Sequence, residues 1–160
     1  MSTRDDDVDN QPLVNIAPTL SFVWLDGNDK EYLKFIDKYS NLLGIDDRSW
    51  TFYDDKAFFL RMFESIKHPQ EIILITSGRL ATEIIEEIHP LKQLQGLFIF
   101  CRIITTYTPL AKKYHKIHGI QSDLNFLYQD IRTNLKISQS EEAGNRANFI
   151  FSDRDIRKIG

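Results

Sequence analysis

The stretch that decides the fold is Glu71-Ile-Ile-Leu-Ile-Thr-Ser-Gly-Arg-Leu80. Its apolar residues 72–75 run without alternation, and the chemistry then changes at once to Thr-Ser-Gly-Arg. A strand that has no polar face must be covered on both sides, which is typical of the middle of a parallel sheet. Residues 80–88 then place apolar side chains at helical spacing. A buried strand that passes through a small turn into a helix is half of a β-α-β unit.

The same alternation recurs along the chain. We expect strands at residues 20–25, 50–53, 72–76, 97–101 (reaching 104 at most) and 119–122, the last being the weakest. We expect helices at residues 31–43, 54–66, 80–88, 109–118 and 123–135. The residues that predict helix ends are Gly44, Asp54 or Asp55, Ser77, Pro109, and Ser122 or Asp123. This pattern predicts a three-layer, doubly wound α/β sandwich with a five-stranded, mainly parallel sheet in the order 2-1-3-4-5, similar to flavodoxin and receiver domains.

The chain divides into three parts by composition. Residues 1–19 are acidic and lack periodicity, which predicts a disordered acidic leader. Residues 20–136 carry the α/β pattern. Residues 137–160 are polar at first, which predicts a linker or the start of a following element that is truncated here.

Composition excludes several classes of function. The net charge of -3 without a basic stripe argues against a nucleic-acid partner. Cys101 is the one cysteine, so no internal disulfide can form. The chain has neither a signal peptide nor an apolar run near the ~18 residues that span a bilayer. We therefore expect a cytoplasmic protein without a membrane partner.

Polar residues gather where the predicted strands end. In an open parallel sheet, ligands bind beyond the carboxyl ends of the strands, at the point where the strand order reverses. Asp26 after the first strand should there face Ser77, Gly78 and Arg79 after the third. The free N–H groups of a helix N-terminus favour an anion, Gly78 would allow its close approach, and Arg79 could bind it in a bidentate manner. These four residues are the predicted ligand-binding site.

A simpler explanation of the same residues is purely structural. Ser77 would cap the helix, and Arg79 would pair with Asp26 or Asp29. The chain lacks the Gly-x-x-x-x-Gly-Lys-Ser/Thr pattern of a phosphate loop. Other polar residues at the same edge are Asp54, Asp55, Cys101, Arg102, Ser122 and Asp123.

The acidic residues Asp26, Asp29, Asp54 and Asp55 could hold Mg²⁺ as in a receiver domain. The third strand nevertheless ends in Thr76-Ser77, without the aspartate that accepts the phosphoryl group, so the chain is a pseudo-receiver at best. Helix capping and turn formation explain these residues more simply. We predict no metal ion and no cofactor.

A cysteine and two histidines offer a second kind of chemistry. Cys101 could act as a nucleophile, but it lacks a recognisable partner base, and a small residue at a strand end is the simpler interpretation. We expect His115 and His118 on one helix, at a spacing that can share a metal ion, although surface histidines are the simpler interpretation. We predict no catalytic residue.

Several stretches together resemble a known type of domain; they are residues 23–26, 72–80, 88–94, 98–101 and 111–119. They are similar to the N-terminal, receiver-like α/β domain of certain invertebrate multidomain proteins. There the domain precedes tetratricopeptide repeats of the kinesin-light-chain type or an arginine-specific ADP-ribosyltransferase domain. The resemblance covers about residues 20–136 and implies no established activity. The transferase's Glu-x-Glu signature is missing, and a TIR-type NAD hydrolase of similar topology would offer Glu83 or Glu86 by position only.

These observations favour a non-catalytic signalling or protein-interaction module of a larger multidomain protein, whose partner is another protein or a neighbouring domain. One alternative is an enzyme or sensor that binds a nucleotide or phosphate ligand at the carboxyl edge of the sheet. Another is the N-terminal fragment of an ADP-ribosyltransferase whose catalytic domain is absent from this chain.

Overall fold

The structure, a computed structural model, describes residues 19–67 and 69–143, with residues 137–143 described by their backbone alone. The strands are β1 (Thr19–Leu25), β2 (Trp50–Tyr53), β3 (Gln70–Ser77), β4 (Leu94–Phe100) and β5 (Ile117–Gln121). The helices are α2 (Lys30–Leu43), α3 (Lys56–Glu64), α4 (Gly78–Ile88), α5 (Thr108–Lys113) and α6 (Leu124–Ala143), with short 3-10 turns η1 (Asp47–Ser49) and η2 (Ile104–Thr106).

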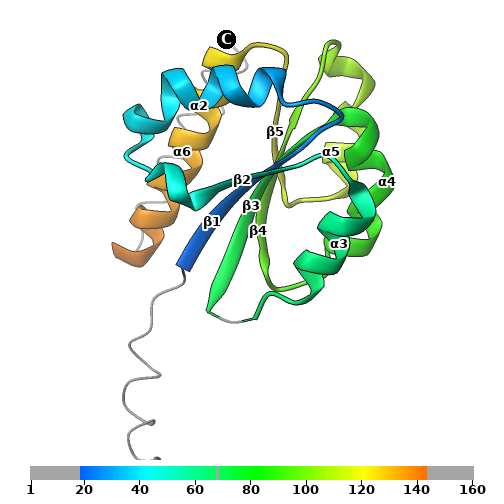
Figure 1. The fold of residues 1–160 in the computed structure, drawn as a ribbon, viewed down its shortest axis with the longest axis horizontal. Coiled ribbons are helices and arrows are strands. Elements are labelled where there is room, and N and C mark those ends of the chain that lie inside the picture. The colour runs from blue at the N-terminus through cyan, green and yellow to red at the C-terminus, as the bar shows by residue number, and fades with distance from the viewer. Residues whose placement is uncertain (1–18, 68, 144–160) are drawn as a thin grey trace, which may run out of the picture.

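The strands form one parallel sheet in the order β2-β1-β3-β4-β5, so the predicted fold is confirmed. Helices α2 and α6 cover one face of the sheet, and α3, α4 and α5 cover the other (Figure 1). Strand β3 lies in the middle, between β1 and β4. The side chains of residues 72–75 are between 0% and 2% exposed, as an apolar run covered on both sides requires.

Alternation along β3 divides the interior into two cores. Ile72 and Leu74 face the layer of α3, α4 and α5, where the buried side chains are mainly aliphatic. Ile73 and Ile75 face the layer of α2 and α6, which is rich in aromatic rings. Each fully buried side chain of this size stabilises the fold by about 1.5–3 kcal/mol.

The aromatic core is organised around Trp24 of β1. Its indole ring lies 5.6 Å from the ring of Phe35 on α2, 5.8 Å from that of Tyr32 and 6.1 Å from that of Phe100, between ring centroids. On the helices, Tyr39 of α2 stacks on Tyr128 of α6 at 4.8 Å. These contacts hold α2 and α6 together on the same face of the sheet.

Helix ends carry the caps that the sequence predicts. Gly44 has a positive φ of 74° after α2, a conformation that glycine adopts without strain. The carboxylate of Asp55 accepts the N–H of Phe58 at 3.1 Å and so begins α3. The carboxylate of Asp123 accepts the N–H groups of Asn125 at 2.8 Å and Phe126 at 3.2 Å, which begins α6.

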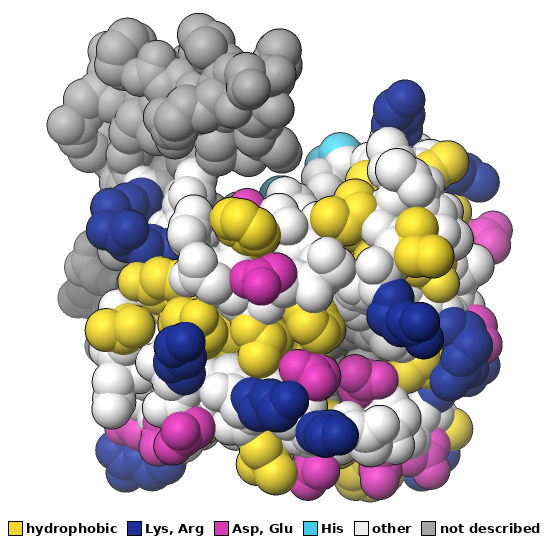
Figure 2. Space-filling view, turned by 90° about the horizontal axis from the view of Figure 1, so that it is seen from above, with side chains coloured by type: hydrophobic (Ala, Val, Ile, Leu, Met, Phe, Trp, Pro, Cys, Tyr) yellow, Lys and Arg dark blue, Asp and Glu magenta, His cyan; other side chains and the backbone are white. Residues whose placement is uncertain are grey.

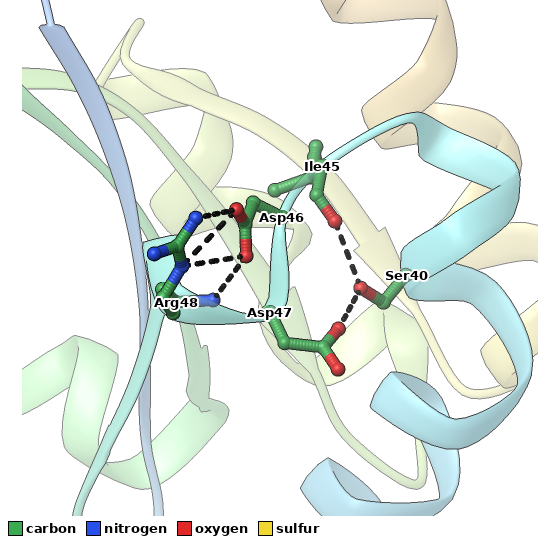
Figure 3. A network of polar contacts seen from close by, with 5 residues as sticks. All are labelled: Ser40, Ile45, Asp46, Asp47 and Arg48. Carbon is green, nitrogen blue, oxygen red and sulfur yellow. Dashed lines mark hydrogen bonds and ion pairs between the residues drawn. The ribbon is translucent and has the colours of Figure 1, made fainter.

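A polar network fastens the connection between α2 and β2 (Figure 3). The buried hydroxyl of Ser40 lies 2.8 Å from Oδ1 of Asp47 and 3.1 Å from the carbonyl oxygen of Ile45. Beside it, the carboxylate of Asp46 accepts the backbone N–H of Arg48 at 2.9 Å and pairs with its guanidinium at 2.8 Å. The connection is therefore fixed from within by Ser40 and at the surface by an exposed ion pair.

Some boundaries differ from the predictions. Helix α5 ends at Lys113 and β5 begins at Ile117, because Ile117 pairs with Leu97 of β4. His118 consequently lies in a strand, and the expectation that it shares a helix with His115 was wrong. Strand β4 begins at Leu94 and ends at Phe100, so Cys101 follows the strand.

Two helices also differ from expectation. Leu33 and Leu42 of α2 match the helical spacing, but they are 54% and 63% exposed, because the buried face is centred on Phe35 and Tyr39. Helix α6 continues to Ala143, past residue 136 where we expected the domain to end. The predicted leader, apart from Thr19, and residues 144–160 of the predicted linker lie outside the described residues. None of the described helices is long and apolar enough to pass through a bilayer.

Candidate functional site

A groove of about 690 Å³ lies at the carboxyl edge of the sheet. The residues that line it end strands β3 and β4, follow β1, β4 and β5, or lie in the first turn of a helix: Asp26, Glu31, Ser77, Gly78, Phe100, Cys101, Arg102 and Ser122. Figure 2 views the molecule from above this edge, where hydrophobic, basic and acidic side chains are intermixed. The topology thus brings three of the four predicted site residues together: Asp26, Ser77 and Gly78. Arg79 is not among the described residues that line the groove.

Ser77 connects β3 directly to α4. Its Oγ accepts the backbone N–H of Leu80 at 3.3 Å, and its φ of -68° and ψ of 161° are those of an N-cap residue. The structural explanation of Ser77 is therefore confirmed. Its hydroxyl hydrogen can still be donated toward the groove, because the cap uses the oxygen only as an acceptor.

The ring of Tyr107 packs directly against Gly78. A Cβ atom placed on Gly78 would lie 2.1 Å from two carbons of the Tyr107 ring. The missing side chain thus makes room for this ring beside the first turn of α4. An anion that approaches the N-terminus of α4 would share this space with Tyr107.

Arg79 forms an ion pair within its own helix, α4. Its guanidinium pairs with the carboxylate of Glu83 at 3.1 Å, and Lys56 of α3 pairs with the same carboxylate at 3.1 Å. The expected pairing of Arg79 with Asp26 or Asp29 was therefore wrong, because Glu83 lies one turn further on the same face of α4. The hydrogen bond from Lys56 lowers the pKa of Glu83, which works against the smaller effect of burial, and Arg79 lowers it further.

Polar side chains at this edge are engaged in local hydrogen bonds. Oδ1 of Asp26 accepts the N–H of Gly27 at 2.7 Å, and the side chain of Asn28 accepts the N–H of Lys30 at 3.0 Å. Asp55 caps α3, as described above. Across residues 19–67 and 69–143, no three side chains of the His, Cys, Asp and Glu types gather closely enough to hold a metal ion.

Cys101 lies at the rim of the groove with its thiol directed at the backbone. Its Sγ lies 3.6 Å from the carbonyl oxygen of Ile103, and burial raises the pKa of the thiol. A raised pKa keeps the sulfur protonated at neutral pH and therefore weakens it as a nucleophile. Its environment favours a packing role.

Sequence reasoning missed Glu31, Phe100 and Tyr107. Glu31 lies in the first turn of α2 and Phe100 is the last residue of β4, so the topology alone could have placed both at this edge. Tyr107 left no local signal, because its contact with Gly78 joins distant parts of the chain.

Comparisons with protein-family models, with curated proteins and with solved structures gave no match to this chain.

Proposed function

We propose that this chain is a non-catalytic signalling or protein-interaction module, and that it contacts its partner through the segment that follows β4. The observation that carries the proposal is the exposure of two consecutive isoleucines there. Ile103 is 62% exposed and Ile104 is 37% exposed, directly after the groove residues Cys101 and Arg102. Single exposed apolar residues are ordinary, but protein interfaces bury such side chains at their centres.

The two isoleucines are presented by an ordered turn. The N–H of Thr106 donates to the carbonyl of Ile103 at 3.2 Å, and the N–H of Tyr107 donates to that of Ile104 at 3.1 Å. Tyr107 in turn packs on Gly78 of α4. A partner would thus meet apolar side chains that are already held in position, which lowers the entropic cost of binding.

Site-specific photocrosslinking tests this surface without knowledge of the partner. A photoreactive phenylalanine analogue in place of Ile103 should give a discrete crosslinked protein in extracts of cells that express the chain. The matched control places the analogue at Leu42, which is 63% exposed on α2. The proposed surface would be contradicted if neither position gave a crosslinked protein. It would also be contradicted if the two positions gave crosslinks of equal strength.

A second candidate function is recognition of a nucleotide or phosphate ligand in the groove. The groove volume of about 690 Å³ favours it, since small-molecule sites usually occupy about 300–1,000 Å³. Arg102 would supply the positive charge in place of Arg79, and Ser77 a hydroxyl donor. This would make the chain a sensor or an enzyme.

Thermal unfolding separates the two candidates. Saturating ATP, NAD or Mg²⁺, at about a hundred times the Kd, would stabilise a binding protein by roughly 2.7 kcal/mol, or several degrees. The shift with ATP or NAD should vanish in Arg102→Ala and persist in Lys92→Ala, whose exposed charge lies at the opposite end of β4. Unchanged melting with each ligand would count against the groove as their site.

The resemblance supports a further proposal, that the chain belongs to a multidomain protein of the cytoplasm. Tetratricopeptide repeats or an ADP-ribosyltransferase domain would then follow. Sequencing the gene beyond the codon for Gly160 tests this proposal directly, and a stop codon at that point would refute it.

A further inference from the structure

Helices α4 and α5 are joined at both ends by ring contacts. At the carboxyl edge, Tyr107 before α5 lies on Gly78 at the start of α4. At the opposite end, His89 follows α4 and meets the connection between α5 and β5. The ring of His89 lies 4.6 Å from that of His115 and 5.2 Å from that of Tyr114, between centroids, in edge-to-face geometry.

Other contacts also hold the connection between α5 and β5: the N–H of Leu97 donates to the carbonyl oxygen of Lys116 at 2.9 Å, and Tyr114 packs against the aliphatic core. Nζ of Lys116 donates to the carbonyl oxygen of Leu91 at 2.9 Å, which ties the same connection to the chain after α4. Nε2 of His89 is buried and has no hydrogen-bond partner among the described residues. In the protonated ring both nitrogens carry a hydrogen, and the N–H at this buried position has no acceptor among the described residues, which makes the charged form costly.

The charges around His89 are mostly of one sign. His115 and Lys116 act on it from the α5–β5 connection, and Lys113 lies over the ring of Tyr114 at 5.3 Å. Glu71 of β3 acts on Lys116 as the opposing charge. Burial lowers the pKa of His89, and the charges of His115 and Lys116 lower it further. These effects outweigh the attraction between a cation and the C-terminus of α4.

We propose that the contact between His89 and His115 is a pH-sensitive latch, which holds the α5–β5 connection on the end of α4 near neutral pH and releases it when His89 gains a proton. Histidine is the side chain that gains its proton in this range. A protonated His89 is repelled by the charges of His115 and Lys116. Release leaves α5 held at its other end by Tyr107, so residues 114–117 gain freedom while the turn that carries Ile103 and Ile104 stays in place.

NMR spectra of the full chain, recorded between about pH 7.5 and 5, test the latch. The backbone signals of residues 89–94 and 114–117 should shift or broaden together on acidification, while those of β1 and β3 stay in place. In His115→Gln this joint change should be lost or much reduced, and the pKa of His89, read from its ring signals, should rise. Lys112→Gln, which removes an exposed charge of α5 outside the cluster, should behave as the wild type.

Two results would overturn the proposal. One is a wild-type spectrum in which residues 114–117 do not respond to acid. The other is a response in His115→Gln as large as in the wild type, which would show that the ring contact does not control it. His89→Gln provides a second route to the same comparison, should His115→Gln fold poorly.

Discussion

The ring of Tyr107 lies on Gly78, so close that a Cβ atom at Gly78 would come within 2.1 Å of two ring carbons. We expect Gly78→Ala to displace the ring and to lower the free energy of unfolding by about 1–3 kcal/mol, the usual cost of overpacking. Urea unfolding measures this loss.

The control is Gly27→Ala, because a Cβ at Gly27 meets no atom within 4 Å. The cost of Gly78→Ala should shrink when Tyr107 is also alanine, since the clash is then removed. Equal stability of the Gly78→Ala and Gly27→Ala proteins would contradict the contact.

Ser40 is 1% exposed, and its hydroxyl contacts the connection after α2. We expect Ser40→Ala to lower the free energy of unfolding by about 1.5–3 kcal/mol, because it removes a hydrogen bond to the charged Asp47 carboxylate at 2.8 Å. Arg48→Ala breaks the neighbouring ion pair between Arg48 and Asp46, whose side chains are 90% and 51% exposed, and it should lower stability less than Ser40→Ala does, because exposed ion pairs contribute little. A larger loss of stability in Arg48→Ala than in Ser40→Ala would contradict the structural role that we assign to Ser40.

Thr76 of β3 is fully buried, and its Oγ1 has no hydrogen-bond partner among the described residues. Valine has the same shape without the polar atom, so Thr76→Val should leave stability unchanged or raise it by about 1–3 kcal/mol, the desolvation cost of an unpaired group. Chemical denaturation gives the difference, with Thr76→Ala as the variant that should destabilise through its cavity. A clear loss in Thr76→Val would reveal a hydrogen bond that holds the hydroxyl.

His89 makes the fold sensitive to acid. Its pKa is lowered in the folded chain, first by burial and then by the charges of His115 and Lys116, so the unfolded chain binds the proton more readily. The contribution to stability is therefore fully present above the unfolded pKa of about 6.5 and is lost as the pH falls below it. Urea unfolding at a series of pH values should show this decline, and His89→Gln should flatten it. A wild-type decline that is unchanged in the variant would assign the acid sensitivity to other groups.

The centre of the fold could be predicted from local sequence because a strand without a polar side chain must be buried on both faces. The apolar run Ile72–Ile75 is compatible only with a strand covered on both faces, and β3 is that strand. Asp55 and Asp123 likewise cap helices through bonds to residues two or three positions away. Short-range physics of this kind is visible in the sequence.

The boundary between α5 and β5 could not be predicted in this way. Pro109 marks the start of a helix, but its end depends on the pairing of Ile117 with Leu97, which lies on another strand. Periodicity therefore assigned His118 to the helix.

The candidate site likewise has a part that the sequence predicts and a part that it does not. Sheet topology brings Asp26, Ser77 and Gly78 to one groove, as predicted. Arg79 was misplaced because Glu83 competes for its charge on the same helix face.

The division of the interior into an aromatic and an aliphatic core separates the optical signals of the protein. Both tryptophans, Trp24 and Trp50, are buried in the layer beneath α2 and α6. Tryptophan fluorescence therefore reports on the core beneath α2 and α6. A local loss of packing beneath α3, α4 and α5 would not change it. A single tryptophan introduced at Tyr114 would give the silent half its own reporter.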